Sequence, residues 1–241
     1  MTIWAYGDSF VAGDQDEKDK NNADISVMEY NRYNVSFVSH LSNMLEIDLV
    51  NRAVSGSGNF PQIDKLLVDS KKFKDSDIVL FGITSTWRDR FSLPHHFPEI
   101  LNKNIGPFLI DMDLYKSKNF NTIPSIDLFH IISILDSIEI KLNVKILKFN
   151  CFHDVYIETE EYYKKFFSPN NYIGFGKKGN TLTDILLDSW DEESNSNLDH
   201  TTLKIAKNYK RFFTCKNHPN TLGHQKIADW FYNYFKNNKI I

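Results

Sequence analysis

The sequence predicts an α/β protein whose parallel sheet is covered by helices on both faces. Short apolar runs of strand length alternate along the chain with longer segments in which apolar residues recur at helical spacing. Residues 77–82 form a run that is apolar after Asp77 and shows no alternation, which is typical of a strand buried on both faces. The sequence has no internal repeat or low-complexity tract, so the alternation of strands and helices favours a doubly covered parallel sheet.

Four short segments are expected to form strands, and longer segments between them are expected to form helices. The strands are Thr2–Tyr6, 47–50, 77–82 and 144–149. The helices are residues 35–45, a segment that begins near Pro61, residues 125–142 and the strongly amphipathic residues 219–237. Residues 13–32 are dominated by Asp, Lys and Asn without periodicity, so they are expected to be a solvated loop.

The composition is that of an ordinary globular chain. Its 241 residues fit one domain with a sizeable core, and a net charge of −3 gives no footprint for nucleic acid. No apolar run approaches the roughly 20 residues that span a bilayer. The chain opens on no signal-peptide pattern, and two cysteines are too few for a disulfide framework. A cytoplasmic location is therefore expected, and later release by lysis or incorporation into a viral particle is compatible with it.

Ser9 is a candidate nucleophile because it follows the first expected strand directly. In parallel sheets, ligands bind outside the carboxyl ends of the strands, where the strand order reverses. Gly7 leaves room for the backbone there, and a serine hydroxyl becomes reactive when a base takes its proton. The alternative is that Gly7-Asp8-Ser9 is only a turn, since these residue types are common in turns.

His218 is the candidate base for that serine. It stands just before the terminal helix, in the segment 217–220, and a doubly wound sheet can return this end of the chain to the first strand. A helix-capping or surface histidine is the alternative. His224 lies further along the same helix, next to Gly223, and is expected to be structural. The pair at 95–96 has no spacing that suggests a metal site.

Together these segments resemble the sequence blocks of the SGNH, or GDSL-like, hydrolases. Residues 7–10, Gly-Asp-Ser-Phe, are similar to the first block, which supplies the nucleophile. Residues 51–59 resemble the second block, where Gly56 falls on the glycine whose N–H helps to bind the oxyanion. The segment 218–220 is similar to the last block, whose histidine is the base. The three blocks lie in the family's order.

The resemblance implies a flavodoxin-like three-layer α/β/α sandwich with a central parallel sheet, the SGNH hydrolase fold. It extends along the whole chain, so residues 1–241 are expected to be a single domain. Three segments match nothing in the family's pattern and are expected to be insertions, at about 13–32, 88–120 and 151–200.

Two positions depart from the family's pattern. Its third block has an asparagine that donates to the oxyanion, where this chain has Thr84, and Asn59 is a candidate substitute. The expected donors are thus the N–H groups of Ser9 and Gly56 with Thr84 or Asn59. The family also has an aspartate three residues before the histidine, where this chain has Cys215. The orienting acid is left open: Asp154, Asp199, a backbone carbonyl or water could replace it.

Arg88 follows the third expected strand and would overlook the same crevice. Its guanidinium could hold an anionic or carbohydrate substrate, and a surface network with Asp89 is equally compatible. Bacteriophage-encoded members of the family look similar in having an arginine at this point.

The resemblance implies a serine esterase that works through an acyl-enzyme, with no metal or organic cofactor. The expected substrate is a small ester, first an acetyl group on a glycan and second a lipid or thioester. The alternative is a catalytically weakened hydrolase domain that binds carbohydrate or forms part of a particle. The oligomeric state is left open.

Overall fold

The computed structural model describes residues 1–14, 25–84, 123–151, 172–173, 181–186, 211–214 and 218–241. Within them lies one sheet of five parallel strands in the order β2-β1-β3-β4-β5. The strands are β1 (Thr2–Tyr6), β2 (Asp48–Asn51), β3 (Ile78–Ile83), β4 (Lys145–Asn150) and β5 (Tyr172–Ile173). This strand order is that of the flavodoxin-like folds.

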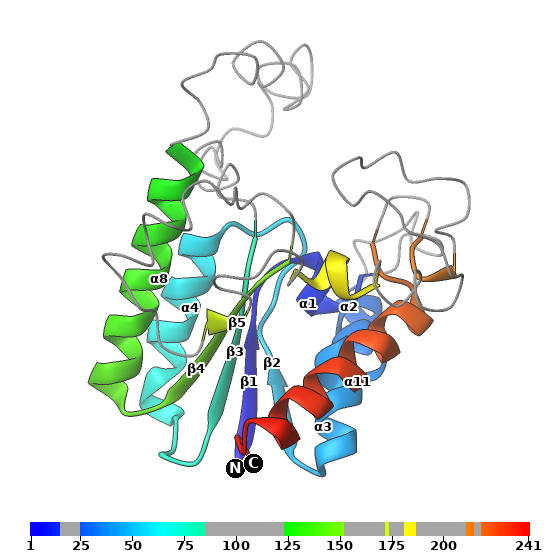
Figure 1. The fold of residues 1–241 in the computed structure, drawn as a ribbon, viewed down its shortest axis with the longest axis horizontal. Coiled ribbons are helices and arrows are strands. Elements are labelled where there is room, and N and C mark those ends of the chain that lie inside the picture. The colour runs from blue at the N-terminus through cyan, green and yellow to red at the C-terminus, as the bar shows by residue number, and fades with distance from the viewer. Residues whose placement is uncertain (15–24, 85–122, 152–171, 174–180, 187–210, 215–217) are drawn as a thin grey trace.

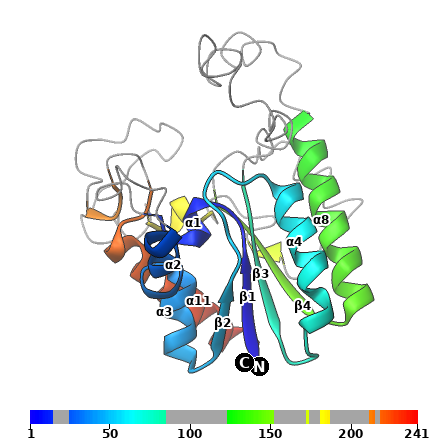
Figure 2. The same cartoon turned by 180° about the vertical axis from the view of Figure 1, so that it is seen from behind.

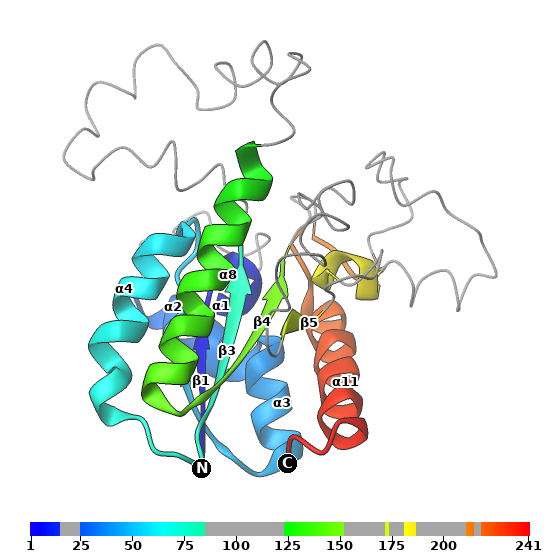
Figure 3. The same ribbon diagram turned by 60° about the vertical axis from the view of Figure 1, so that its left-hand side comes forward.

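Helices cover both faces of the sheet, as Figures 1 and 3 show. On one face lie α1 (Ser9–Ala12), α2 (Ile25–Asn34), α3 (Phe37–Leu45) and α11 (Thr221–Asn237). On the other lie α4 (Asn59–Asp69), which runs into the 3₁₀ turn Ser70–Lys72, and α8 (Ile123–Leu142). The predicted three-layer α/β/α sandwich is therefore confirmed.

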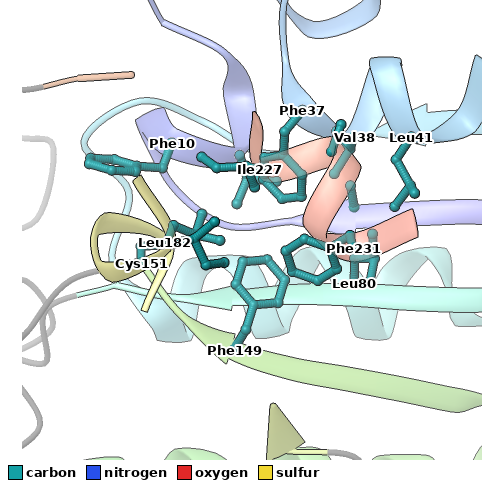
Figure 4. Close-up of a cluster of buried hydrophobic side chains, with 14 of the residues drawn as sticks. Phe10, Phe37, Val38, Leu41, Leu80, Phe149, Cys151, Leu182, Ile227 and Phe231 are labelled. Carbon is teal, nitrogen blue, oxygen red and sulfur yellow. The ribbon is translucent and has the colours of Figure 1, made fainter. Parts of the chain in front are cut away.

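Each face of the sheet has its own apolar core, because successive side chains of a strand point to opposite faces. On β1, Ile3 and Ala5 belong to one core, while Trp4 and Tyr6 belong to the other. The first core contains ring contacts that join α3, β4 and α11. The ring centroid of Phe37 lies 5.9 Å from that of Phe149 and 5.2 Å from that of Phe231 (Figure 4).

The expected strands were placed to within a residue, while α1, α2 and β5 were not predicted. Residues 25–32, expected to be loop, belong to α2 (Ile25–Asn34), so that prediction was wrong for this stretch. The end of α2 is held by one local and one tertiary contact. Ser36 Oγ, four residues along the chain, donates to Arg32 O at 2.7 Å, and Asn51 Nδ2 of β2 donates to the same oxygen at 3.4 Å. The strand β5 has two residues, too few for a pattern, and lies within the segment expected to be an insertion.

The strand order reverses between β1 and β3. The chain passes from β1 to β2 through α1, α2 and α3 on one face, and from β2 to β3 through α4 on the other (Figure 1). The segments that follow β1 and β3 therefore meet at the switch point where α/β proteins bind ligands. Figure 2 shows both termini at the opposite end of the sheet from α1.

Close packing at this point requires glycine. Gly7 has φ +150°, and a Cβ on it would lie 2.6 Å from Val11 Cγ2. A Cβ on Gly82 would meet the same Val11 atom at 2.6 Å. The absence of both side chains lets α1 lie directly over the ends of β1 and β3. Among the described helices, none is long and apolar enough to cross a membrane.

Candidate active site

Ser9 is the first residue of α1, immediately after the turn that ends β1. Asp8 is the N-cap of this helix, and its Oδ1 accepts from Phe10 N at 3.0 Å. Ser9 is 2% exposed, and its Oγ has no hydrogen-bond partner among the described residues. Leaving a buried hydroxyl unpartnered costs about 1–3 kcal/mol, so such a group needs an explanation. At a switch point, a reactive nucleophile is one.

His218 is brought to the same end of the sheet by an irregular strand-like contact ahead of α11. Thr214 N donates to His218 O at 2.7 Å, and His218 N donates to Thr214 Oγ1 at 3.3 Å. The half-buried imidazole meets the ring of Phe10 edge-on, with centroids 5.8 Å apart. Phe10 is the neighbour of Ser9 on α1, so His218, from near the end of the sequence, lies against the short helix that carries Ser9.

The structure records no hydrogen bond between the Ser9 hydroxyl and His218. In unliganded hydrolases such bonds are often long and shorten in the substrate complex. What the described residues show is the placement of His218 against Phe10.

Gly56 lies in the loop after β2, in a turn that is tied to the end of β1. Val54 N donates to Gly7 O at 3.0 Å, and Ser57 N closes the turn onto Val54 O at 3.0 Å. Gln62 makes a second link, since it accepts from Gly7 N at 3.3 Å and donates to Ser57 Oγ at 2.8 Å. Gly56 is exposed with φ +71°, and a Cβ on it would meet nothing within 4 Å. Its backbone conformation, not crowding, favours glycine.

Thr84 and Asn59, the two candidates for the third oxyanion donor, are bonded to each other. Thr84 N donates to Asn59 Oδ1 at 2.9 Å, and Asn59 Nδ2 donates back to Thr84 O at 3.1 Å. The Thr84 hydroxyl donates to Asp8 Oδ2 at 2.8 Å. All three side chains are buried. The end of β3, the start of α4 and the start of α1 are thereby joined across the switch point.

His224 has a structural environment, as the sequence led us to expect. It is fully buried, and its Nδ1 accepts from Phe37 N, the first N–H of α3, at 3.3 Å. Burial, with smaller contributions from His40 and His218, lowers the pKa of His224 to about 3. The ring is therefore neutral, as an accepting Nδ1 requires.

Asp8 and Asn51 are structural partners of the site that the sequence reasoning did not single out. Asp8 could have been found as an Asx residue directly before a helix. Asn51 Nδ2 donates to Val11 O at 2.9 Å and its Oδ1 accepts from Ala53 N at 3.1 Å, which ties β2 to α1. No local pattern reports that contact.

Several predicted site residues lie outside the described part of the chain. They are Arg88, Cys215, Asp154 and Asp199. The substrate contact and the residue that orients His218 therefore stay predictions. Within the described ranges, no group of three or more His, Cys, Asp or Glu side chains could hold a metal ion.

No family model and no curated protein sequence matches the chain. Similar solved structures include a protein of Parabacteroides merdae named as a GDSL-like lipase, which is 14% identical with a TM-score of 0.50, over 96% of this chain and 94% of that one. The lipase Lip_vut3 from a goat rumen metagenome is 12% identical with a TM-score of 0.49, over 97% and 96%. The acetylxylan esterase Axe2 of Geobacillus stearothermophilus is 17% identical with a TM-score of 0.43, over 96% and 92%.

At these identities the likeness concerns the fold. The Parabacteroides structure matches nearly the whole of this chain, and the described residues have the same single parallel sheet between two helical layers. The chain has the SGNH hydrolase fold of the GDSL-like proteins.

Proposed function

We propose that this protein is a serine esterase with Ser9 as its nucleophile and His218 as its base. The observation that carries the proposal is the buried Ser9 hydroxyl, which has no partner in the described residues and lies at the switch point. The contact between His218 and the neighbouring Phe10 supports it. The resemblance of residues 7–10, 51–59 and 218–220 to the blocks of the family supports it independently.

The proposed reaction passes through an acyl-enzyme. Ser9 Oγ attacks the ester carbonyl while His218 takes its proton, and the carbonyl π electrons move onto oxygen. When the carbonyl re-forms, the ester C–O bond breaks and His218 gives the proton to the leaving alcohol. Water then attacks the acyl-Ser9 with His218 again as base, which releases the acid and restores the hydroxyl. These steps require no metal or organic cofactor.

The oxyanion is proposed to be bound by backbone N–H groups and one side chain. Asp8 caps α1 through Phe10 N, which leaves the N–H of Ser9, the first of the helix, to face the oxyanion. Gly56 N–H is the second donor, and Asn59 or Thr84 is the third. Losing one such donor typically costs about 100- to 1000-fold in rate.

For the substrate we propose a small acyl ester, with an acetylated glycan ahead of a lipid. A guanidinium is suited to bind sugar hydroxyls or an anionic group, and Arg88 is proposed for that contact. We propose that residues 1–241 act as one SGNH hydrolase-like domain, with insertions at about 13–32, 88–120 and 151–200 around its core.

A second candidate function is a weakened hydrolase domain that binds carbohydrate or forms part of a particle. The engagement of the Thr84 hydroxyl by Asp8, where the family's asparagine would donate to the oxyanion, favours it. Cys215 in place of the usual aspartate favours it as well.

Covalent labelling of Ser9 by a fluorophosphonate probe tests the proposal. We expect stoichiometric modification, found by mass spectrometry on the peptide that contains Ser9. Labelling should vanish in Ser9→Ala and fall strongly in His218→Ala. It should persist in Ser39→Ala, a matched control because Ser39 is also buried, on α3. A folded wild-type protein that stays unlabelled would favour the binding function.

A further inference from the structure

A chain of hydrogen bonds crosses the switch point beside the candidate nucleophile. It runs from Asn59 through Thr84 to Asp8 and ends on the N–H of Phe10. Ser9 itself is not part of it, but it lies between Asp8 and Phe10 in the sequence. The role inferred below for this series of hydrogen bonds rests on the proposed function and extends it.

The direction of the central bond limits what the Thr84 hydroxyl can do. A hydroxyl has one proton to donate. Thr84 gives this proton to Asp8 Oδ2, over 2.8 Å. Asp8 is 0% and Thr84 4% exposed, so water does not compete for this bond. A hydroxyl whose proton is held by Asp8 has none to donate to an oxyanion.

The contacts of Asp8, the acceptor of this bond, show which role Thr84 can have if it does not donate to the oxyanion. The helix α1 has four residues, too few to be stable on its own, so its position depends on tertiary contacts. Asp8 holds its first turn through Phe10 N, and Asp8 is in turn held by Thr84. Thr84 is fixed at both its N–H and its carbonyl by Asn59.

We propose that Thr84 is a positioning residue and not an oxyanion donor. Through Asp8 it fixes the backbone on both sides of Ser9, and so the direction of the Ser9 hydroxyl and N–H. Asn59 binds the backbone N–H and carbonyl of Thr84 and so connects this series of hydrogen bonds to α4. The threonine thus replaces the family's asparagine with a different role.

A double-mutant cycle of Asp8 and Thr84 tests this inference. The variants are Thr84→Val, which removes the hydroxyl at nearly equal volume, Asp8→Ala, and the two together. The measured quantity is the second-order rate of fluorophosphonate labelling at Ser9, well below the unfolding temperature. We expect Thr84→Val to lower this rate about 10- to 100-fold in the wild-type background, the usual effect of losing a hydrogen bond to a buried charge. In the Asp8→Ala background, Thr84→Val should have no further effect.

Two controls separate positioning from loss of stability. Thr84→Ser keeps the hydroxyl and should restore most of the labelling rate. Thr183→Val removes another buried threonine hydroxyl, which donates to Cys151 O at 3.2 Å, and should leave the rate unchanged. The inference is overturned if Thr84→Val lowers the labelling rate as much in the Asp8→Ala background as in the wild type. It is also overturned if Thr84→Val does not lower the rate in the wild type.

Failure of the proposed function has a different signature. In that case wild-type Ser9 is not labelled, and amide hydrogen exchange of Phe10 becomes the readout. Faster exchange at Phe10 in Thr84→Val, but not in Thr183→Val, supports the inference that Thr84 stabilises the first turn of α1 through Asp8. Unchanged exchange overturns it.

Discussion

Single residues decide how closely the backbone segments of the site approach one another. Gly82 is the clearest case, because it has no positive φ and only the lack of room for a Cβ requires glycine there. A Cβ there would lie 2.6 Å from Val11 Cγ2 and 2.9 Å from Cys151 Sγ. Both neighbours are buried and belong to the core under α1, part of which Figure 4 shows.

Gly82→Ala should therefore destabilise the protein through overpacking, by about 1–3 kcal/mol in the free energy of unfolding. Adding Val11→Ala removes the closest contact and should recover part of that loss. Urea unfolding of the three proteins measures both effects. The matched control is Gly56→Ala, where a Cβ meets nothing and only the positive φ is unfavourable. Equal costs at positions 82 and 56 would contradict the crowding argument.

The residue that orients His218 is the second question at this scale. If Cys215 occupies the place of the family's aspartate, Cys215→Asp should raise kcat on nitrophenyl acetate by at least about tenfold, because a carboxylate stabilises the imidazolium. KM should change little, since the interaction forms in the transition state. Cys215→Asn is the uncharged control. A flat or lower kcat would instead indicate Asp154, Asp199 or a backbone carbonyl as the existing partner.

At the scale of elements, the packing of α11 on α3 carries His218 to the site. The link between these helices includes a titratable acceptor, His224 Nδ1, beneath the first N–H of α3. Burial lowers the pKa of His224 to about 3. Burial also lowers the pKa of His40 on α3, although the nearby Asp229 carboxylate acts in the opposite direction and raises it. Protonation of either imidazole is thus disfavoured in the folded state.

The pH dependence of stability follows with a definite sign. The unfolded chain binds a proton at His224 below a pKa of about 6.5, while the folded protein does so only near pH 3. Unfolding therefore takes up protons in this window, and the free energy of unfolding should fall as the pH drops from about 6.5 toward 3, by a few kcal/mol. His224→Gln, which offers a non-titrating acceptor, should flatten this part of the curve. Chemical denaturation of both proteins at a series of pH values measures the difference, and identical slopes would contradict it.

At the scale of the whole molecule, the fold brings an early and a late segment of the sequence together at one end of the sheet. Ser9, after the first strand, is the first residue of α1, and His218, before the last helix, lies against Phe10 of α1. Three of the four expected strands are shifted by one residue and the first is unchanged, because turns and apolar runs are local signals.

The sequence by itself determined the α/β class, four of the five strands, most of the helices, and Ser9 and His218 as candidate residues. These features depend on periodicity, turn residues and short motifs, which neighbouring residues specify. The prediction of a loop over 13–32 failed at α2, since one of the contacts that hold its end comes from Asn51 of β2, which no local pattern could report.

Only the tertiary structure decided which polar groups became partners. Lys148 reads as an ordinary strand lysine, yet it is 0% exposed and ion-paired at 2.6 Å to both Asp136 and Glu139 of α8. The bond between Thr84 and Asp8 likewise joins residues 76 apart in the sequence. Such pairs form because burial removes water from polar groups that must then find partners, and which partner is within reach depends on how the layers pack.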